Sequence, residues 1–143
     1  MRGRIPKQEI ELLKQVPIFS SCSREELRAI AQLGSKVDVE EGTVLTEKGK
    51  PGHEFFLVLE GVASCNVGRH EVRRFGPGQF FGEMALLHGG VRSADVVAKS
   101  DMRLLALDSR EFKSMLTTTP YVGIKMLANL AERLSDADDA YTA

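Results

Sequence analysis

The sequence lacks tryptophan, has only two cysteines and carries almost no net charge, with 19 lysines and arginines against 20 aspartates and glutamates in 143 residues. Cys22 and Cys65 form neither a disulfide framework nor a metal-binding spacing. A net charge of −1 gives no reason to expect bulk electrostatic binding of nucleic acid. We therefore expect no direct DNA binding.

Long apolar runs and catalytic motifs are missing as well. No run approaches the ~20 apolar residues of a membrane span, and the basic residues near the N-terminus are not followed by an apolar signal core. His53, His70 and His88 are too scattered to chelate a metal by local spacing. The sequence also contains no P-loop, no HExxH motif and no serine–histidine pairing. It predicts a cytoplasmic protein that does not insert into a membrane and is not an enzyme.

What the sequence does contain is a change of hydrophobic period, helical at both ends and alternating in the middle. Ser23 and Glu26 form a capping box in front of a helix that Gly34 ends. From residue 35 the period falls to about 2, and glycine turns separate short apolar segments, which is typical of a β-sandwich or β-roll. Residues 55–59 predict a strand buried on both faces. The other predicted strands cover residues 35–40, 43–46, 62–67, 70–75, 91–98 and 102–107, with a strand end at 80–81.

The segments outside the strands carry helix signals. Residues 6–15 predict a short helix, and residues 16–19 an extended connector, because the residue before a proline avoids the helical region. Near the other end, Asp108 or Ser109 caps a helix, and Pro120 suits the first turn of a second, last one. The apolar face predicted for that last helix contains Val122, Ile124, Met126, Leu127, Leu130, Ala131 and Leu134.

Residues 80–94 carry the chemistry. Gly82 allows a sharp turn after two aromatics, and a short helical turn follows before two glycines end it. The free N–H groups of a helix start bind anions, and the guanidinium of Arg92, on the next strand, forks onto phosphate oxygens. Glu83 in the same place would accept from a hydroxyl, because a carboxylate and a phosphate repel each other. An anion beside a hydroxyl describes a phosphorylated sugar.

The letters FGEMA, then LLHGGV, then RSA in this stretch resemble the phosphate-binding cassette of the cyclic nucleotide-binding domain family. The resemblance extends from about residue 16 to residue 133. It implies an α+β fold, namely an eight-stranded antiparallel β-roll (jelly-roll-like) with N-terminal helices, a short cassette helix and C-terminal hinge and lid helices. The implied division is an N-terminal helical segment over residues 1–34, the β-roll over 35–108 with its cassette at 81–94, and C-terminal helices over 109–143.

The resemblance also implies roles for the cassette residues. Arg92 and backbone amides near Ala85 would hold the phosphate, and Glu83 would hold the ribose 2′-hydroxyl. Ser93 would touch the phosphate through its hydroxyl or its backbone. The other cassette residues expected in the pocket are Phe81, Gly82, Met84 and Ala94.

The base is expected at the hairpin of residues 62–75 and the last helix. Strand alternation puts Cys65 on one face of its strand, and Val72 together with Arg74 on one face of the partner strand. The resemblance implies that Cys65 and Val72 touch the purine, with an ordinary core thiol as the alternative for Cys65. Arg133 either reaches the base from the last helix or is a solvated helix charge.

The implied function is a cyclic nucleotide-binding regulatory or sensor domain that binds 3′,5′-cyclic AMP, with cyclic GMP as the other candidate, and transmits binding through helix movement. Ser93 fits bacterial cyclic AMP binders, and no cofactor beyond the ligand is implied. Asp95 departs from the family pattern and would repel the phosphate if it shared the inward face with Ser93. A degenerate interaction domain that no longer binds nucleotide is therefore an alternative, and a haem or metal sensor using His70, His88 or Cys65 is another.

No helix-turn-helix follows the last helix within the 143 residues. We therefore expect either a stand-alone sensor or the regulatory domain of a longer channel, kinase, transporter or regulator. The expected partners are a cyclic nucleotide and an effector domain or protein, and a homodimer is an open alternative.

Overall fold

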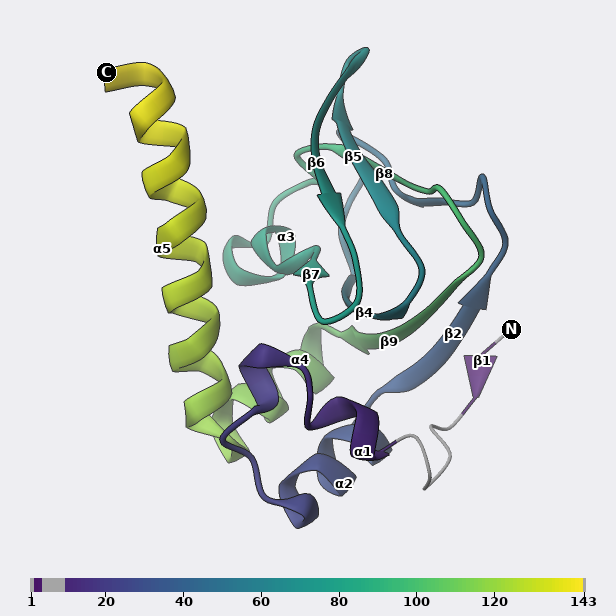
Figure 1. Ribbon diagram of the computed structural model, residues 1–143, viewed down its shortest axis with the longest axis vertical. Helices are drawn as coiled ribbons and strands as arrows, with labels where there is room; N and C mark the ends of the chain where they lie inside the picture. Colours follow the sequence, from purple (N-terminus) through teal and green to yellow (C-terminus); the bar gives the residue numbers. More distant parts are fainter. Residues whose placement is uncertain (1, 4–9, 143) are drawn as a thin grey trace.

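The computed structural model describes the backbone of residues 2–3 and 10–142 and the side chains of residues 10–136. These residues form a β-roll with helices gathered at one end and one long helix along its side (Figure 1). The N-terminal helices are α1 (Ile10–Leu13), the 3₁₀ helix η2 (Pro17–Phe19) and α2 (Arg24–Leu33). Of the helix predicted over residues 6–15, residues 6–9 lie outside the described part.

Two antiparallel sheets make up the roll, with strand orders β1-β2-β9-β4-β7 and β3-β8-β5-β6. The predicted antiparallel β-roll and the α+β class are thereby confirmed. Within the described residues, the two-residue strand β1 is a ninth strand, which pairs with β2 at the edge of its sheet. The strands are β1 (Arg2–Gly3), β2 (Ser35–Val39), β3 (Val44–Thr46), β4 (Glu54–Glu60), β5 (Ala63–Val67), β6 (His70–Phe75), β7 (Phe80–Phe81), β8 (Asp95–Ala98) and β9 (Met102–Asp108).

Two predicted segments differ from the structure. The strand expected over residues 91–98 begins only at Asp95, because the backbone of Arg92 bonds to a turn instead of a ladder: its N–H donates to the Lys50 carbonyl at 2.8 Å and its carbonyl accepts from Gly49 at 3.0 Å. The connector over residues 16–19 contains η2. A proline with its fixed φ suits the first position of a helix, so only the residue before it stays extended.

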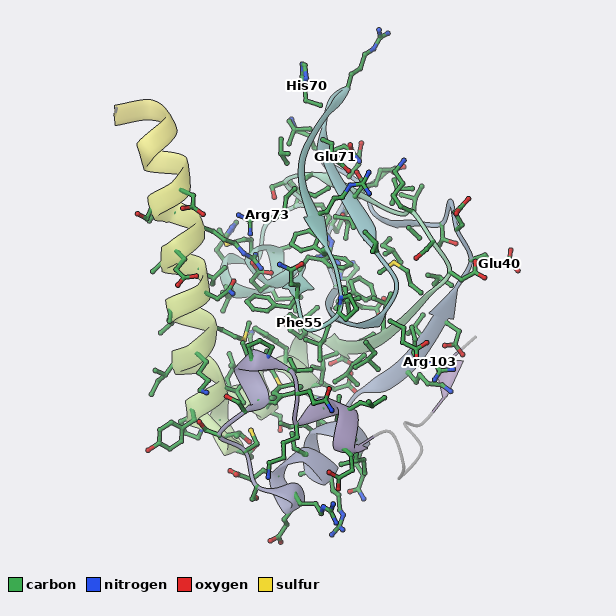
Figure 2. All side chains as sticks on the ribbon, viewed as in Figure 1. Glu40, Phe55, His70, Glu71, Arg73 and Arg103 are labelled. Atoms are coloured by element: carbon green, nitrogen blue, oxygen red, sulfur yellow. The ribbon has the colours of Figure 1, made fainter. Side chains whose placement is uncertain are left out.

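Strand β4 separates two hydrophobic cores. Phe55 and Leu57 face the helices, and Phe55 lies where the roll meets them (Figure 2). Phe56 and Val58 point the other way, into the interior of the roll. The strand predicted to be buried on both faces is confirmed, and it fixes the helical end of the molecule to the roll that contains the cavity.

Strong caps define the helices on either side of the strands. The capping box of α2 is formed by Ser23 and Glu26, as predicted. The structure has an equivalent box at the start of α4 (Ser109–Thr118), where Asp108 and Glu111 exchange backbone-to-side-chain hydrogen bonds of 2.8 Å. Such a box satisfies N–H groups that a helix start leaves without partners.

The last helix, α5 (Pro120–Thr142), is only partly buried. Its first turns pack on α4 and η2 and bury Val122 and Met126. The wide apolar face predicted for it is confirmed only in part: Leu130 also packs against the core, whereas Ile124, Leu127 and Leu134 are 60%, 67% and 64% exposed. The cause is the path of the helix, which leaves the helical end and runs along the side of the roll, past the short helix α3 (Glu83–His88) (Figure 1).

Candidate functional site

A cavity of about 310 Å³ is bordered by the hairpin β5–β6, the cassette segment (residues 81–94) and α5. All eleven residues that the sequence assigns to the site line this cavity: Cys65, Val72, Phe81, Gly82, Glu83, Met84, Ala85, Arg92, Ser93, Ala94 and Arg133. Among the described residues, Thr46, Arg73, Phe75 and Val96 also line it, and sequence analysis did not single these out. The eleven residues therefore surround one cavity, as their predicted roles require. The roles themselves stay predictions.

Gly82 makes the turn from β7 into α3. Its φ is 91°, a value that residues with a side chain rarely adopt. A Cβ at this position would lie 2.8 Å from the Glu54 carbonyl oxygen and 2.8 Å from Nη1 of Arg92. The tight turn brings the first turn of α3, whose N–H groups have no partner inside the helix, to the cavity wall at Met84 and Ala85.

Arg92 is a buried cation, with 8% of its surface exposed. Its Nη1 donates to the Gly82 carbonyl at 3.0 Å and its Nη2 to the Glu54 carbonyl at 2.7 Å. Burial lowers the pKa of Arg92, although the carboxylates of Glu54 and Glu83 oppose the shift, and an arginine stays protonated in either case. Both of these hydrogen bonds go to carbonyl oxygens, and Arg92 also lines the cavity, where a guanidinium can bind an anion.

Glu83, the first residue of α3, is 3% exposed. Its Oε1 lies 3.3 Å from Nη1 of Arg133, and its Oε2 is buried with no hydrogen-bond partner. Burial raises the pKa of this carboxyl group, and the positive charges of Arg133 and Arg92 oppose that effect. A buried acceptor without a partner is costly, so Oε2 is a place where a donor from a ligand would be stabilised.

Arg133 reaches the same place from α5. Its Nη2 donates to the Phe80 carbonyl at 3.0 Å, and its guanidinium carbon lies 4.7 Å from the centre of the Phe80 ring and 5.5 Å from that of Phe75. Burial lowers the pKa of Arg133, while Glu83 opposes the shift. The alternative of a solvated helix charge is therefore wrong. Arg133 connects α5 to β7 and α3 beside the cavity.

The hairpin β5–β6 differs from the predicted pairing. A regular two-residue hairpin would set Cys65 opposite Val72, but a β-bulge sets Cys65 opposite Arg73. Arg73 consequently lines the cavity, and Val72 lies at its rim, 58% exposed. Arg74, which alternation grouped with Val72, bonds to Glu71 at 2.8 Å instead. Nothing in the local sequence signals the bulge, so the sequence does not predict Arg73 in the cavity.

Cys65 lies on the same wall of the cavity as Arg73 and is half-buried. Burial is the main cause that raises the pKa of its thiol, and the charges of Arg73 and Arg133 oppose it. The thiol is therefore a neutral, weakly polar contact in the cavity wall.

Asp95 does not share the cavity with Ser93. Ser93 lines it, whereas the Asp95 carboxylate accepts from the N–H of Lys48 at 2.7 Å, and Asp95 is not among the lining residues. The face shared with Ser93 that strand alternation suggests is not found, because the strand begins only at Asp95. The carboxylate thus closes a turn, and Asp95 does not line the cavity.

Two further findings concern other kinds of site. Among the residues that the structure describes, no group of three or more His, Cys, Asp or Glu side chains is placed to hold a metal ion. The described helices include none with the length and hydropathy needed to cross a bilayer.

The amino-acid sequence of this chain is similar to those of known proteins. Residues 36–119 match the model of a family described as the cyclic nucleotide-binding domain. The cAMP-dependent protein kinase regulatory subunit of Hypocrea atroviridis is 34% identical over 120 residues, which are 79% of this chain and 26% of that protein. The chain therefore spans about a quarter of the length of that curated relative.

Solved structures show the same fold. The catabolite activator protein of Thermus thermophilus superposes with a TM-score of 0.80 and 30% identity, over 88% of this chain and 62% of that one. The regulatory subunit of a cAMP-independent protein kinase A from Trypanosoma brucei superposes with a TM-score of 0.76 and 26% identity, over 88% of this chain and 47% of that one. In both cases the chain corresponds to less than two thirds of the larger protein.

Proposed function

The chain belongs to the cyclic nucleotide-binding domain family, and we propose that its cavity binds a 3′,5′-cyclic nucleotide, with cyclic AMP as the expected ligand. The observation that carries this proposal is the pair formed by Arg92 and Glu83. A buried guanidinium held on neutral carbonyls and a buried carboxylate with one oxygen unpartnered line the same cavity. A cyclic phosphodiester fused to a ribose supplies an anion and a hydroxyl at a fixed separation.

Each part of the nucleotide has a counterpart in the cavity. The phosphate accepts from Arg92 and from N–H groups near Ala85 at the start of α3. The ribose 2′-hydroxyl donates to Oε2 of Glu83, which is otherwise without a partner. The purine lies against Cys65 and Val72. Volume is consistent with this assignment, since ligand cavities begin at roughly 300 Å³ and this one measures about 310 Å³.

Binding is regulatory in this proposal. The nucleotide draws the cassette segment inward and favours the position of α5 in which Arg133 bonds to the Phe80 carbonyl. The change reaches the N-terminal helices through the core that they share with α5. A ligand shifts such an equilibrium only by its difference in affinity for the two states. The protein would act in the cytoplasm on an effector domain or a partner protein, with a homodimer as a further arrangement.

The names of the relatives support cyclic AMP but do not decide it. One relative is named for dependence on cyclic AMP and a structural neighbour for independence from it. The degenerate, non-binding alternative loses its sequence support, because Asp95 bonds to a turn and does not line the cavity. Both nucleotides must therefore be compared directly.

The test is a thermal-shift scan followed by calorimetric titration with cyclic AMP and cyclic GMP. A ligand that binds only the folded state raises its stability, so a saturating nucleotide should raise the melting temperature. Arg92→Ala should weaken binding roughly tenfold to a hundredfold, because a hydrogen bond to a charged group contributes about 1.5–3 kcal/mol.

The matched control is Arg110→Ala, which removes an exposed arginine from α4 and should leave affinity unchanged. A wild-type protein whose melting temperature responds to neither nucleotide would contradict the proposal and favour a non-binding interaction domain. An Arg92→Ala variant with wild-type affinity would contradict the phosphate role alone.

A further inference from the structure

Arg73 enters the cavity because of the β-bulge in the hairpin β5–β6. From the tip, Val67 pairs with His70 and Asn66 with Glu71, but the next pair is Cys65 with Arg73. Val72 is the extra residue, and Arg73 is thereby returned to the inward face of the strand that also carries Phe75. Figure 2 shows Arg73 between β6 and α5. The bulge thus exchanges an aliphatic side chain for a guanidinium at the wall opposite Cys65.

Arg73 differs from its neighbouring arginines in its contacts: its charge acts on Glu83, but it forms no direct bond within the part of the chain that the structure describes. Arg92 bonds to two carbonyls, Arg133 to Glu83 and the Phe80 carbonyl, and Arg74 to Glu71. Within the described residues, no hydrogen bond or ion pair to Arg73 is present. The described lining contains three arginines and one carboxylate. If Arg92 binds a phosphate and Arg133 pairs with Glu83, Arg73 is the lining arginine that still lacks an acceptor.

The position of Arg73 assigns it to the base and not to the phosphate. It lies on the hairpin, opposite Cys65 and next to Val72, whereas Arg92 lies on the cassette segment under the start of α3. A guanidinium only donates hydrogen bonds. Guanine presents two acceptors side by side, O6 and N7, and pairs with arginine in a bidentate manner; adenine presents N7 next to an amino donor, which arginine does not match.

We propose that Arg73 is a specificity-determining residue that raises the affinity for a cyclic nucleotide whose purine carries an oxo group at C6 relative to one that carries an amino group, and so counteracts a preference for cyclic AMP. This inference rests on the proposed binding of a cyclic nucleotide. It concerns the ratio of the affinities for cyclic GMP and cyclic AMP, and the ratio is set by the bulge, because a regular hairpin would leave Arg73 on the outer face.

The experiment is a calorimetric titration of the wild type, Arg73→Leu and Arg73→Gln with cyclic AMP, cyclic GMP and cyclic IMP. Cyclic IMP carries the C6 oxo group without the amino group of guanine. Arg73→Leu should weaken cyclic GMP and cyclic IMP roughly tenfold and leave cyclic AMP within about twofold, since one bidentate contact discriminates bases by about that factor. Arg73→Gln should shift the ratio further toward cyclic AMP, because a glutamine amide pairs with N6 and N7 of adenine.

The matched control is Arg74→Leu, which removes the adjacent arginine, bonded to Glu71, and should leave the three affinities in their wild-type ratio. Equal weakening of all three nucleotides by Arg73→Leu, or an unchanged ratio in both Arg73 variants, would overturn the inference while leaving nucleotide binding intact. If the wild type binds none of the three, the proposed function itself fails. A circular dichroism melt of each variant separates loss of folding from loss of selectivity.

Discussion

Glu83 is a carboxylate whose burial makes the stability of the protein depend on pH. Burial raises its pKa above the ordinary value of 4.5, and Arg133 and Arg92 only partly oppose this. The folded protein therefore holds the proton more tightly than the unfolded chain. The free energy of unfolding should fall as the pH rises from about 4.5 through the folded-state pKa. Glu83→Gln removes the titration, so the variant should gain stability relative to the wild type over that window.

Urea unfolding of both proteins between pH 4 and pH 8 measures the effect. The difference in unfolding free energy, variant minus wild type, should rise with pH and then level off. Glu132→Gln, at an exposed position on α5, is the control for loss of one carboxylate. A Glu83→Gln difference that stays flat across the range would contradict the buried titration.

At the same scale, the sequence predicts the site residues whose placement depends on local spacing. Gly82, Glu83 and Arg92 lie within eleven positions, and a turn, a helix start and a return segment bring them together. Arg73 depends on a bulge, and its environment depends on a helix sixty residues later in the chain. The hydrophobic pattern of the hairpin contains neither the bulge nor the position of that helix, so the sequence does not predict Arg73 in the cavity.

At the scale of elements, the junction from β7 into α3 requires glycine for two reasons. Gly82 and Gly89 border α3 on either side, and both have a positive φ, of 91° and 66°. A Cβ at Gly89 would meet nothing within 4 Å, whereas one at Gly82 would meet the Glu54 carbonyl oxygen at 2.8 Å. Gly89→Ala should therefore cost about 1 kcal/mol from backbone strain, and Gly82→Ala about 2 kcal/mol or more, because a backbone atom must also move.

Chemical denaturation gives the two stabilities, and calorimetric titration gives the two affinities. Gly82→Ala should also weaken nucleotide binding, since the added methyl group lies 2.8 Å from Nη1 of Arg92, while Gly89→Ala should bind as the wild type does. If Gly82→Ala and Gly89→Ala lose the same free energy of unfolding and bind the nucleotide equally well, backbone strain alone matters at this junction.

Element boundaries were predictable where a side chain sets them. The box of Ser23 with Glu26 and the cap at Asp108 fix helix starts through bonds between residues three positions apart. The start of β8 was not predictable from the sequence, because it depends on backbone hydrogen bonds between Arg92 and a turn some forty residues earlier. Apolar residues in 91–98 carry the same alternation whether or not a ladder partner is present, so the pattern extended the strand too far.

At the scale of the whole molecule, α5 is attached at two separate places. Val122 and Met126 join the core shared by the helices and one face of β4, and Arg133 bonds to the roll at Phe80 and Glu83. The intervening Leu127 is largely exposed. The near part of the helix therefore depends on apolar burial, which continues as far as the partly buried Leu130, and beyond it Arg133 supplies the polar contacts to the roll. The sequence predicts one continuous apolar face because its hydrophobic residues follow the helical period, and that pattern does not contain the point at which the helix leaves the core.

Arg133→Ala tests this arrangement by amide hydrogen exchange. The change removes the bond to the Phe80 carbonyl, the pair with Glu83 and the contacts with two aromatic rings. Exchange should become faster in residues 127–136 and stay at the wild-type rate in residues 120–126, because local opening follows local contacts. Glu132→Ala, on the same turn but exposed, should change neither segment. In the wild type, saturating cyclic nucleotide should slow exchange in residues 127–136 if α5 closes on the ligand. The same exchange pattern in both variants would mean that α5 is held by its first turns alone, and a closure relayed through Arg133 would then be wrong.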